Sequence, residues 1–557
     1  MERQAKLPAM AAVVLLAAVA IGPGLGRAAL WEPDEPRFAE ATRQMFARGD
    51  FLTPYFNGVP RFEKPILFYW LQAAAVSVLG ANELAMRVPA ALAGIGAVSL
   101  LYLIGVRVAS ERAAIAAALV FATMFRFVVY ARQGLTDVPV LFFIVAALYG
   151  FMRATDVRPP PMAVWLAWAA VGLGVLTKGP VGFLSLIIWG AYAASRRDVT
   201  LVSRIRPVIG LCLAVAIALP WYLAMMAMHG RAFVDFALGH EIVARVVSEE
   251  SFAPTRGFFY YWKVWPGDAA PWSVLFVAAA AWALVRWRRL DAQTRQATTF
   301  ALAWFVAVFV TFSVSRSKVP HYVLPAYPAA ALLIGVFVDR VANTISEAWW
   351  WRLPMALVAV VIFAASALLA WSGGVVMPEA QAATRALVPM LLAAGGAALL
   401  AAIWKKQLMS ATVTLAVLLA AIFAVIGAII VPGTIERSKP MPYLAREAAQ
   451  LMPDDGVLGL LGRYGASSLI YYSGRRVQFL DDDESTIAFL ASRPGAVCVL
   501  PATDLARLTP RLPPTVRTVA IAEEFNVRFE RLLERQRTPG RQWVVVAAGG
   551  TEAALER

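Results

Sequence analysis

The sequence predicts a polytopic α-helical membrane protein that carries a small polar domain after its last membrane span. Of its 557 residues, 60% are apolar, and the mean hydropathy is +0.65. Several apolar runs exceed the ~18 residues that a helix needs to cross a bilayer. Backbone groups in hydrocarbon must form hydrogen bonds within their own segment, so these runs are predicted to be helices. After residue 432 the apolar runs become short and alternate with polar turns.

About thirteen runs qualify as spans, and the loops between them alternate in charge. The predicted spans are residues 8–29, 88–107, 112–131, 138–153, 162–177, 179–195, 207–228, 271–287, 297–315, 320–338, 353–372, 386–404 and 409–431. Arginine and lysine gather in every second loop, which is typical of cytoplasmic loops and places the N-terminus in the cytoplasm. The first run is interpreted as a retained span, because it is long and no small-residue cleavage site precedes Trp31.

The net charge of +15 follows largely from these basic loops, so no nucleic-acid partner is predicted. The two cysteines, Cys212 and Cys498, lie in an apolar run and in the polar tail. Neither a disulfide nor a thiolate metal site is expected from them.

Two long loops, about 30–87 and 229–270, are predicted on the outer face with the C-terminal domain. In the first, residues 36–48 fit an amphipathic helix along the membrane surface. Residues 65–79 are apolar but only ~15 long, the length of an interfacial helix. Counting them as a span would also place the arginines of 196–206 outside, against the charge rule.

The chain therefore divides into a transmembrane domain, 1–432, and an outer α/β domain, 433–557. In the latter, four short apolar runs are predicted as strands: "VLGLL", "SLIYY", "AVCVL" and "QWVVVAA". No inverted repeat of the kind found in many transporters is evident.

Carboxylates gather where outer loops meet the membrane. "WEPDEPRF" holds Glu32, Asp34 and Glu35; helix capping before a proline explains one of them but not all three. "RFEKP" holds Glu63 and Lys64, for which a solvated ion pair is the plain alternative. "GLTDVP" holds Asp137, for which capping of the next helix is an equal alternative.

Basic residues also occur on the outer face, where the charge rule disfavours them. They are Lys178 in "LTKGP", Arg256 in the second loop, and Arg316 and Lys318 in "SRSKVPHY", which ends on Tyr322. Snorkelling from helix ends explains some of these, and a pocket for an anionic group explains the others, with Tyr322 beside it. Among Glu63, His240 and His321 the metal signal is weak, and no metal or other cofactor is predicted to be required.

Acids beside anion-binding bases, at the depth of lipid headgroups, indicate a substrate with a phosphate and a centre that develops positive charge. Glycosyl transfer from a lipid phosphate fits, because the sugar passes through an oxocarbenium-like state that carboxylates stabilise.

The motifs "WEPDEPRFAEATRQM", "RFEKPILFYWLQA", "RQGLTDVP", "LTKGPVG" and "SRSKVPHYVLPAYP" resemble those of the 4-amino-4-deoxy-L-arabinose (aminoarabinose) lipid A transferases. These belong to the GT-C polyprenyl-phosphate-sugar glycosyltransferases and are related to the protein O-mannosyltransferases. The resemblance implies an enzyme of the Gram-negative inner membrane that moves aminoarabinose from undecaprenyl phosphate to lipid A phosphates in the periplasm, and we expect it to be a monomer. It also implies that Asp34 is the essential acid, with Glu35 beside it and Asp137 as its partner. Glu63 and Lys64 would form the donor site, with Lys64 on the lipid phosphate.

A lipid A phosphate, with a second pKa near about 6, is already largely ionised and hardly needs a general base. We therefore expect Asp34 to hold the ammonium of the sugar or to stabilise the developing cation. The same reaction with another sugar or a protein acceptor is the nearer alternative. A lipid transporter or flippase is the more distant one, because ionisable residues lie at the outer boundary and not at mid-membrane.

Overall fold

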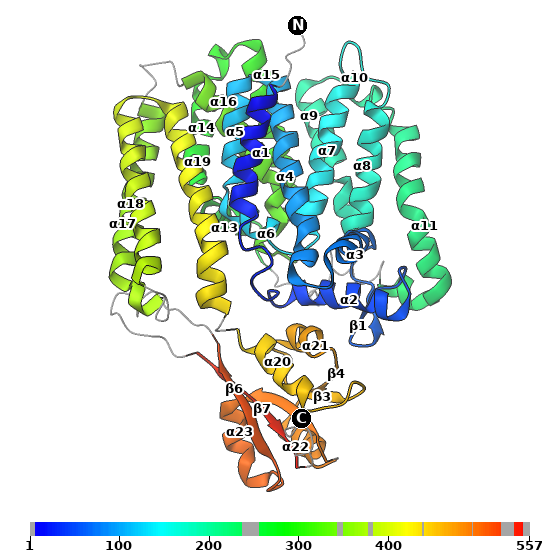
Figure 1. Cartoon of the computed structure of the whole chain (residues 1–557). Helices are drawn as coiled ribbons and strands as arrows, with labels where there is room; N and C mark the ends of the chain where they lie inside the picture. Colours follow the sequence, from blue (N-terminus) through cyan, green and yellow to red (C-terminus); the bar gives the residue numbers. More distant parts are fainter. Residues whose placement is uncertain are drawn as a thin grey trace.

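The computed structural model describes residues 6–236, 256–341, 349–376, 382–436, 439–492, 494–524 and 540–549. A bundle of long helices forms one part, and a small domain containing a β-sheet lies at one end of it (Figure 1). The N-terminus lies at the opposite end, as an odd number of spans requires. The end that carries the small domain is called the outer face below.

Fifteen of the described helices build or flank the bundle. They are α1 (Leu7–Ile21), α4 (Glu83–Val108), α5 (Glu111–Ala122), α6 (Phe125–Ala131), α7 (Asp137–Ala154), α8 (Ala163–Lys178), α9 (Leu184–Arg196), α11 (Pro207–Val234), α13 (Tyr260–Asp268), α14 (Trp272–Arg286), α15 (Ala292–Val314), α16 (Tyr327–Val341), α17 (Trp349–Val376), α18 (Ala382–Trp404) and α19 (Leu408–Val425). Shorter turns join them: η1 (Gly179–Phe183), α10 (Thr200–Ser203), η3 (Trp287–Arg289), η4 (Pro320–Ala326) and the π-helix η6 (Ile426–Ile435).

The number of candidate spans is smaller than the thirteen predicted. Within the described residues, nine helices are long and apolar enough to cross a membrane, or up to eleven if two bent helix pairs count as one span each. One difference is α1, whose 15 residues fall short of a full span. The other is the stretch Ala163–Arg196, which counts once although two spans were predicted there. The backbone turns within it at Gly179, which has φ +59°. The helix α9 therefore returns toward the end at which α8 began, and Trp168 near the start of α8 donates to the carbonyl of Ile205 after α9.

Small residues let the helices pack closely. A Cβ added to Gly150 on α7 would lie 2.6 Å from the Cβ of Ala167 on α8, and one on Gly335 of α16 would lie 2.3 Å from the carbonyl oxygen of Ala113. Both distances are below any real contact, so only glycine permits these crossings. This is the usual way in which membrane helices associate, because lipid supplies no hydrophobic driving force between them.

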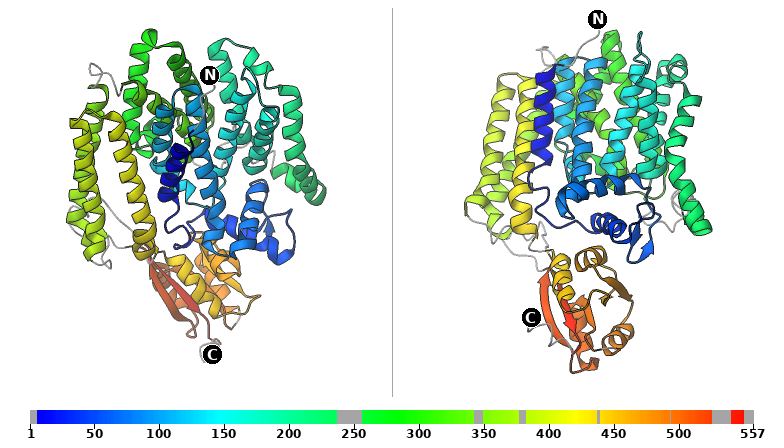
Figure 2. Two further views of the ribbon diagram at one scale, coloured as in Figure 1. Left: turned by 45° about the horizontal axis from the view of Figure 1, so that its top comes forward. Right: turned by 45° about the vertical axis from the view of Figure 1, so that its right-hand side comes forward.

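The first outer loop forms the two surface helices that the sequence predicts. The helix α2 (Asp34–Arg48) buries Phe38, Ala41 and Met45, while Phe46 on the same predicted face remains 42% exposed. The helix α3 (Leu67–Leu79) follows a small hairpin of β1 (Tyr55–Phe56) and β2 (Val59–Pro60). Both helices lie across the outer end of the bundle (Figures 1 and 2).

The C-terminal domain is a mixed five-stranded sheet with helices. Its strand order is β4-β3-β5-β7-β6, with β3 parallel to β4 and β5, and β7 antiparallel to β5 and β6. The strands are β3 (Val457–Leu461), β4 (Arg476–Leu480), β5 (Val497–Pro501), β6 (Arg517–Glu523) and β7 (Gln542–Ala547). The helices are α20 (Pro440–Gln450), α21 (Ala466–Ser473), α22 (Asp483–Ala491) and α23 (Ala502–Leu508), with the turn η8 (Thr509–Arg511).

Three of the four predicted strands are confirmed, but "SLIYY" is wrong: it lies in the helix α21. A short apolar run has no periodicity that separates a strand from a buried helix. Here the flanking residues Gly465 and Gly474, with φ of 70° and 64°, begin and end a helix. Both described cysteines are free, Cys498 buried and Cys212 exposed on α11.

The two faces of the bundle are open to a labelling test. Val157, 99% exposed in the loop after α7, lies at the inner face, and the exposed Asp455 lies in the C-terminal domain. A membrane-impermeant maleimide should label Asp455→Cys in spheroplasts and should label Val157→Cys only after the membrane is broken. The parental protein, with Cys212 and Cys498, is the control, and the reverse labelling pattern would contradict the topology.

Candidate functional site

A buried ion pair anchors the first outer loop. Glu35 on α2 and Arg87 on α4 are 1% and 3% exposed, and Arg87 donates to both carboxylate oxygens of Glu35 at 3.0 and 2.9 Å. The same carboxylate accepts from the backbone N–H of Trp31 at 2.7 Å and from that of Gly134, just before α7. Since its acceptor positions are used within the protein, we infer that Glu35 positions the loop rather than taking part in chemistry.

Asp137, the first residue of α7, lies in a charged cluster at the outer end of the bundle. Its Oδ1 accepts a hydrogen bond from Lys178 Nζ at 2.7 Å and lies 3.7 Å from His321 Nε2. The other ring nitrogen of His321, Nδ1, shares a hydrogen bond of 2.7 Å with the hydroxyl of Tyr130. The end of α8, the start of α7, the turn η4 and the helix α6 thus meet around one carboxylate.

Helix capping does not explain the two aspartates. The N-cap of α2 is Pro33 and that of α7 is Thr136, and neither helix has a side-chain cap hydrogen bond. The side chain of Asp34 is 52% exposed and its Oδ1 lies 3.8 Å from Arg37 Nη1. Asp34 therefore keeps a half-exposed carboxylate, whereas the carboxylate of Asp137 is only 11% exposed and is paired with Lys178.

Lys64 and Asp34 lie within electrostatic reach of the Asp137 cluster. The charge of Lys64 acts on Asp137, and the charge of Asp34 acts on His321. The ammonium of Lys64 also donates to the backbone carbonyl of Glu63 at 2.8 Å. Three stretches far apart in sequence, around residues 34, 64 and 137, therefore converge on one region.

The Glu63 carboxylate pairs with Arg61, whose Nη2 lies 2.7 Å from its Oε2. Burial opposes ionisation of Glu63, but the charges of Arg61 and Lys64 outweigh burial and hold the pKa of Glu63 below its ordinary value of 4.5. Arg61 is itself buried and lies 4.6 Å from the ring centre of Phe38.

The remaining basic residues divide into two groups. Lys178 lies 5.6 Å from the ring centre of Tyr322, which places Tyr322 beside the Asp137 cluster. Lys318 is buried and donates to the backbone carbonyls of Arg256, at 2.9 Å, and of Ser315, so its ammonium closes a loop. Within that loop the N–H of Arg256 donates to the carbonyl oxygen of Arg316 at 3.2 Å.

In the part of the chain that the structure describes, no group of three or more His, Cys, Asp or Glu side chains could hold a metal ion. Of the three weak candidates, Glu63 pairs with Arg61 and His321 lies between Asp137 and Tyr130. His240 lies outside the described residues.

Residues 9–233 match the family model of the dolichyl-phosphate-mannose-protein mannosyltransferases. This stretch contains Asp34, Lys64, Asp137 and Lys178. Over this stretch the chain is similar to the transferases of that family.

Two relatives match beyond that stretch. An uncharacterised protein of Aquifex aeolicus is 32% identical over 344 residues, which cover 60% of this chain and 66% of that protein. The undecaprenyl phosphate-alpha-4-amino-4-deoxy-L-arabinose arabinosyl transferase 2 of Pseudomonas fluorescens is 32% identical over 320 residues, which cover 56% of this chain and 53% of that protein. The chain therefore spans between about half and two thirds of the length of these relatives.

The fold also matches a solved structure. The crystal structure of ArnT from Cupriavidus metallidurans, bound to undecaprenyl phosphate, superposes with a TM-score of 0.75 over 97% of both chains at 23% identity. This polytopic helical GT-C chain with its C-terminal mixed-sheet domain thus has the ArnT-like architecture.

Several side chains of the site escaped sequence analysis. Arg87 had a usable signal, because an ionisable residue near the start of a span is a functional or structural anchor by default. Arg61 stands within the quoted motif "RFEKP", where only its neighbours were selected. Tyr130 gave no signal, since its partner His321 is 191 residues away.

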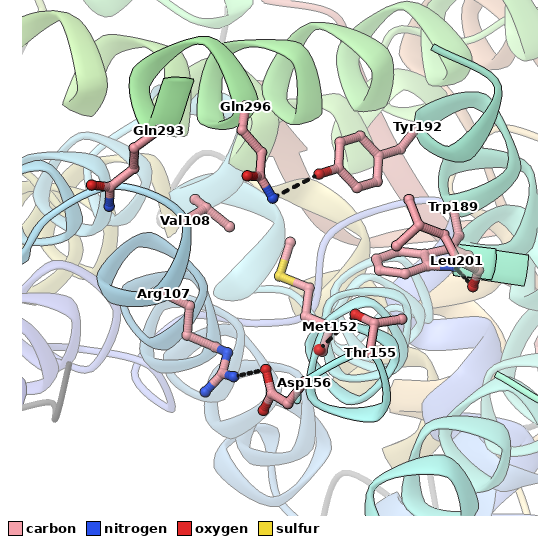
Figure 3. A pocket seen from close by; sticks show the side chains of 10 residues that line it. All are labelled: Arg107, Val108, Met152, Thr155, Asp156, Trp189, Tyr192, Leu201, Gln293 and Gln296. Carbon is pink, nitrogen blue, oxygen red and sulfur yellow. Dashed lines mark hydrogen bonds and ion pairs between the residues drawn. The ribbon is translucent and has the colours of Figure 1, made fainter. Parts of the chain in front are cut away.

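A cavity of about 500 Å³ lies at the other end of the GT-C bundle, at the inner ends of five helical segments. Figure 3 shows the ten lining residues: Arg107, Val108, Met152, Thr155, Asp156, Trp189, Tyr192, Leu201, Gln293 and Gln296. Arg107 pairs with Asp156, and Gln296 donates to the hydroxyl of Tyr192 at 3.2 Å. These residues lie at the face opposite to Asp137, so the cavity is separate from the charged cluster.

Arg87→Leu should unfold the protein more easily, because it leaves the Glu35 carboxylate buried without its partner. The expected loss of stability is about 3–5 kcal/mol, measured by thermal or denaturant unfolding in detergent. Arg158→Leu, at an exposed site in the loop after α7, is the control and should change stability little. Equal effects of the two substitutions would contradict the anchoring role.

The lowered pKa of Glu63 predicts a pH-dependent stability term. Its contribution is fully present above the ordinary pKa of 4.5 and is lost as the pH falls through the lower pKa of the folded state. Wild type should therefore exceed Glu63→Gln in stability most at neutral pH, and the gap should shrink below about pH 4.5. Unfolding of both proteins between pH 3 and 7 measures the gap, and a constant difference would refute the prediction.

Proposed function

We propose that the protein transfers 4-amino-4-deoxy-L-arabinose from undecaprenyl phosphate to a lipid A phosphate at the periplasmic face of a Gram-negative inner membrane. The observation that carries the proposal is that the charges of Asp34 and Lys64 both reach the cluster of Asp137, Lys178 and His321 at the outer end of the bundle. The similarity to the arabinosyl transferase of Pseudomonas fluorescens supports the choice of sugar and carrier.

In this mechanism the lysines bind the phosphate of the donor. Lys64 stands beside the cluster and Lys178 is held by Asp137 at 2.7 Å, so the Asp137 carboxylate orients one of the two phosphate-binding cations. Tyr322 lies next to Lys178 and completes this side of the site. Arg256 and Arg316 belong to the neighbouring loop, which Lys318 closes; their guanidinium groups would meet the phosphate from that side.

The bond that breaks joins the anomeric carbon to the carrier phosphate, and its electron pair leaves with undecaprenyl phosphate. An oxygen of the acceptor phosphate forms the new bond to the same carbon. Between these events the sugar ring carries positive charge, which the half-exposed carboxylate of Asp34 would stabilise. Asp34 would also pair with the ammonium of the sugar. The acceptor phosphate is already ionised, so no general base is needed.

The proposed reaction requires no metal or other cofactor, because lysines and arginines supply the positive charge that stabilises a phosphate leaving group. We propose that the protein acts as a monomer in this form.

Protein O-glycosylation is the second candidate, because the matching family model describes transferases that act on proteins. A hydroxyl acceptor is not ionised at neutral pH, so Asp34 would then serve as general base. The two functions differ in the fate of the sugar.

Expression in a lipid A-modifying bacterium that lacks its own transferase tests the proposal. Mass spectrometry should find aminoarabinose on lipid A with wild type, and a rate lower by roughly 100-fold or more with Asp34→Asn, Lys64→Ala or Asp137→Asn. Asp455→Asn and Lys405→Ala, at exposed sites, are the matched controls and should transfer sugar normally.

Unmodified lipid A together with a glycosylated protein would favour the second candidate. An Asp34→Asn variant with full activity toward lipid A would refute the role proposed for this carboxylate.

A further inference from the structure

We propose that the C-terminal domain positions Asp34 for the reaction, through two contacts at the N-terminus of α21. This inference rests on the proposed function, and it gives the C-terminal domain a role, since no residue of that domain takes part in the mechanism proposed above. In Figure 1, α21 lies directly below α2, on the outer side of the bundle. The contacts involve Glu32 and Arg37, which flank Asp34 in sequence.

The first contact is a helix cap supplied by another part of the chain. The N-cap residue of α21 is Gly465, which has no side chain, and the helix has no side-chain cap hydrogen bond of its own. The backbone N–H of Ser468, in the first turn of α21, donates instead to Oε1 of Glu32. A carboxylate at this position accepts from an otherwise unpaired N–H and interacts favourably with the positive end of the helix dipole. The outer loop and the domain are therefore joined two residues before Asp34.

The second contact joins the domain to Arg37, the side chain that faces the Asp34 carboxylate. Arg37 donates from Nε to Oγ of Ser467 at 3.1 Å, while its Nη1 lies 3.8 Å from Oδ1 of Asp34. Ser467 is 2% exposed, whereas the side chains of Arg37 and Asp34 are 38% and 52% exposed. The buried hydroxyl of Ser467 thus orients the long side chain of Arg37, and the guanidinium group of Arg37 faces the carboxylate of Asp34.

This orientation matters because packing alone does not hold Asp34. Its side chain is half exposed and α2 begins without a side-chain cap. A charge that stabilises a transition state must be placed to within about 1 Å, since larger errors cost roughly 100-fold in rate. Arg37 is accordingly a positioning residue, and Ser467 extends its support into the C-terminal domain.

Other contacts between the domain and the bundle do not involve Asp34 or its neighbours Glu32 and Arg37. Asn57 exchanges two hydrogen bonds of 2.9 Å with the backbone of Val477 on β4. The hydroxyl of Tyr472 accepts from the N–H of Leu30 at 2.8 Å and donates to Glu83 at 3.1 Å. Loss of the Ser467 hydroxyl alone should therefore leave the domain attached while freeing Arg37.

The test is a double-mutant cycle on sugar transfer with Ser467→Ala, Arg37→Gln and their combination. Ser467→Ala should lower kcat roughly three- to tenfold, the size of one ordinary hydrogen bond, and leave KM for the lipid-linked donor unchanged. Once Arg37→Gln is present, Ser467→Ala should have no further effect. Ser467→Thr keeps the hydroxyl and should restore activity. Ser492→Ala, which removes a hydroxyl bonded within its own helix, is the control in the same domain.

Hydrogen–deuterium exchange gives a second readout that needs no sugar transfer. Amides in the first turn of α2 should exchange faster in Ser467→Ala than in wild type and Ser492→Ala, with unchanged thermal unfolding. Unchanged exchange, an unchanged kcat or fully additive effects would overturn the proposal. Inactivity of wild type toward every acceptor would instead count against the proposed function, and exchange in α2 would still decide whether the domain holds this loop.

Discussion

The buried ion pair between Glu35 and Arg87 is the interaction on which the outer site depends. Arg87 uses all five of its N–H donors, two on Glu35 and three on backbone carbonyls between the first helix and α2. Two charges taken out of water are tolerated only when every polar group is satisfied, and that requirement fixes the geometry around them. Since Glu35 also accepts from Gly134, one carboxylate sets the distance between the loop of Asp34 and the start of α7.

The chemistry of the outer site follows from this frame. Asp137 is held by Lys178 and faces His321, so its charge is compensated from one side. Asp34, next in sequence to the buried Glu35, is half exposed and can meet a substrate. The two adjacent residues therefore have different roles. The carboxylate of Glu35 is buried and holds the loop in place, while the carboxylate of Asp34 remains accessible to a substrate.

The first outer loop also joins the bundle to the C-terminal domain. Glu32 caps α21 while Glu35 pairs with Arg87, so a few residues on either side of Asp34 make contacts in two directions. This explains why three carboxylates lie together in "WEPDEPRF". Each has a different partner, and helix capping, the simplest explanation from sequence, applies only to a helix in another domain.

The sequence by itself determined the features that depend on local pattern and on the solvent. Long apolar runs and the amphipathic period of α2 predicted the membrane class and the two surface helices, because a bilayer constrains each segment separately. The helix α21 was misjudged, since a short apolar run without periodicity has no local signature. Only the tertiary structure decided that Arg87 holds Glu35, that Tyr130 meets His321 and that Ser467 meets Arg37. These pairs lie 52, 191 and 430 residues apart, and contacts of that kind depend on how separate helices pack, which no local pattern encodes.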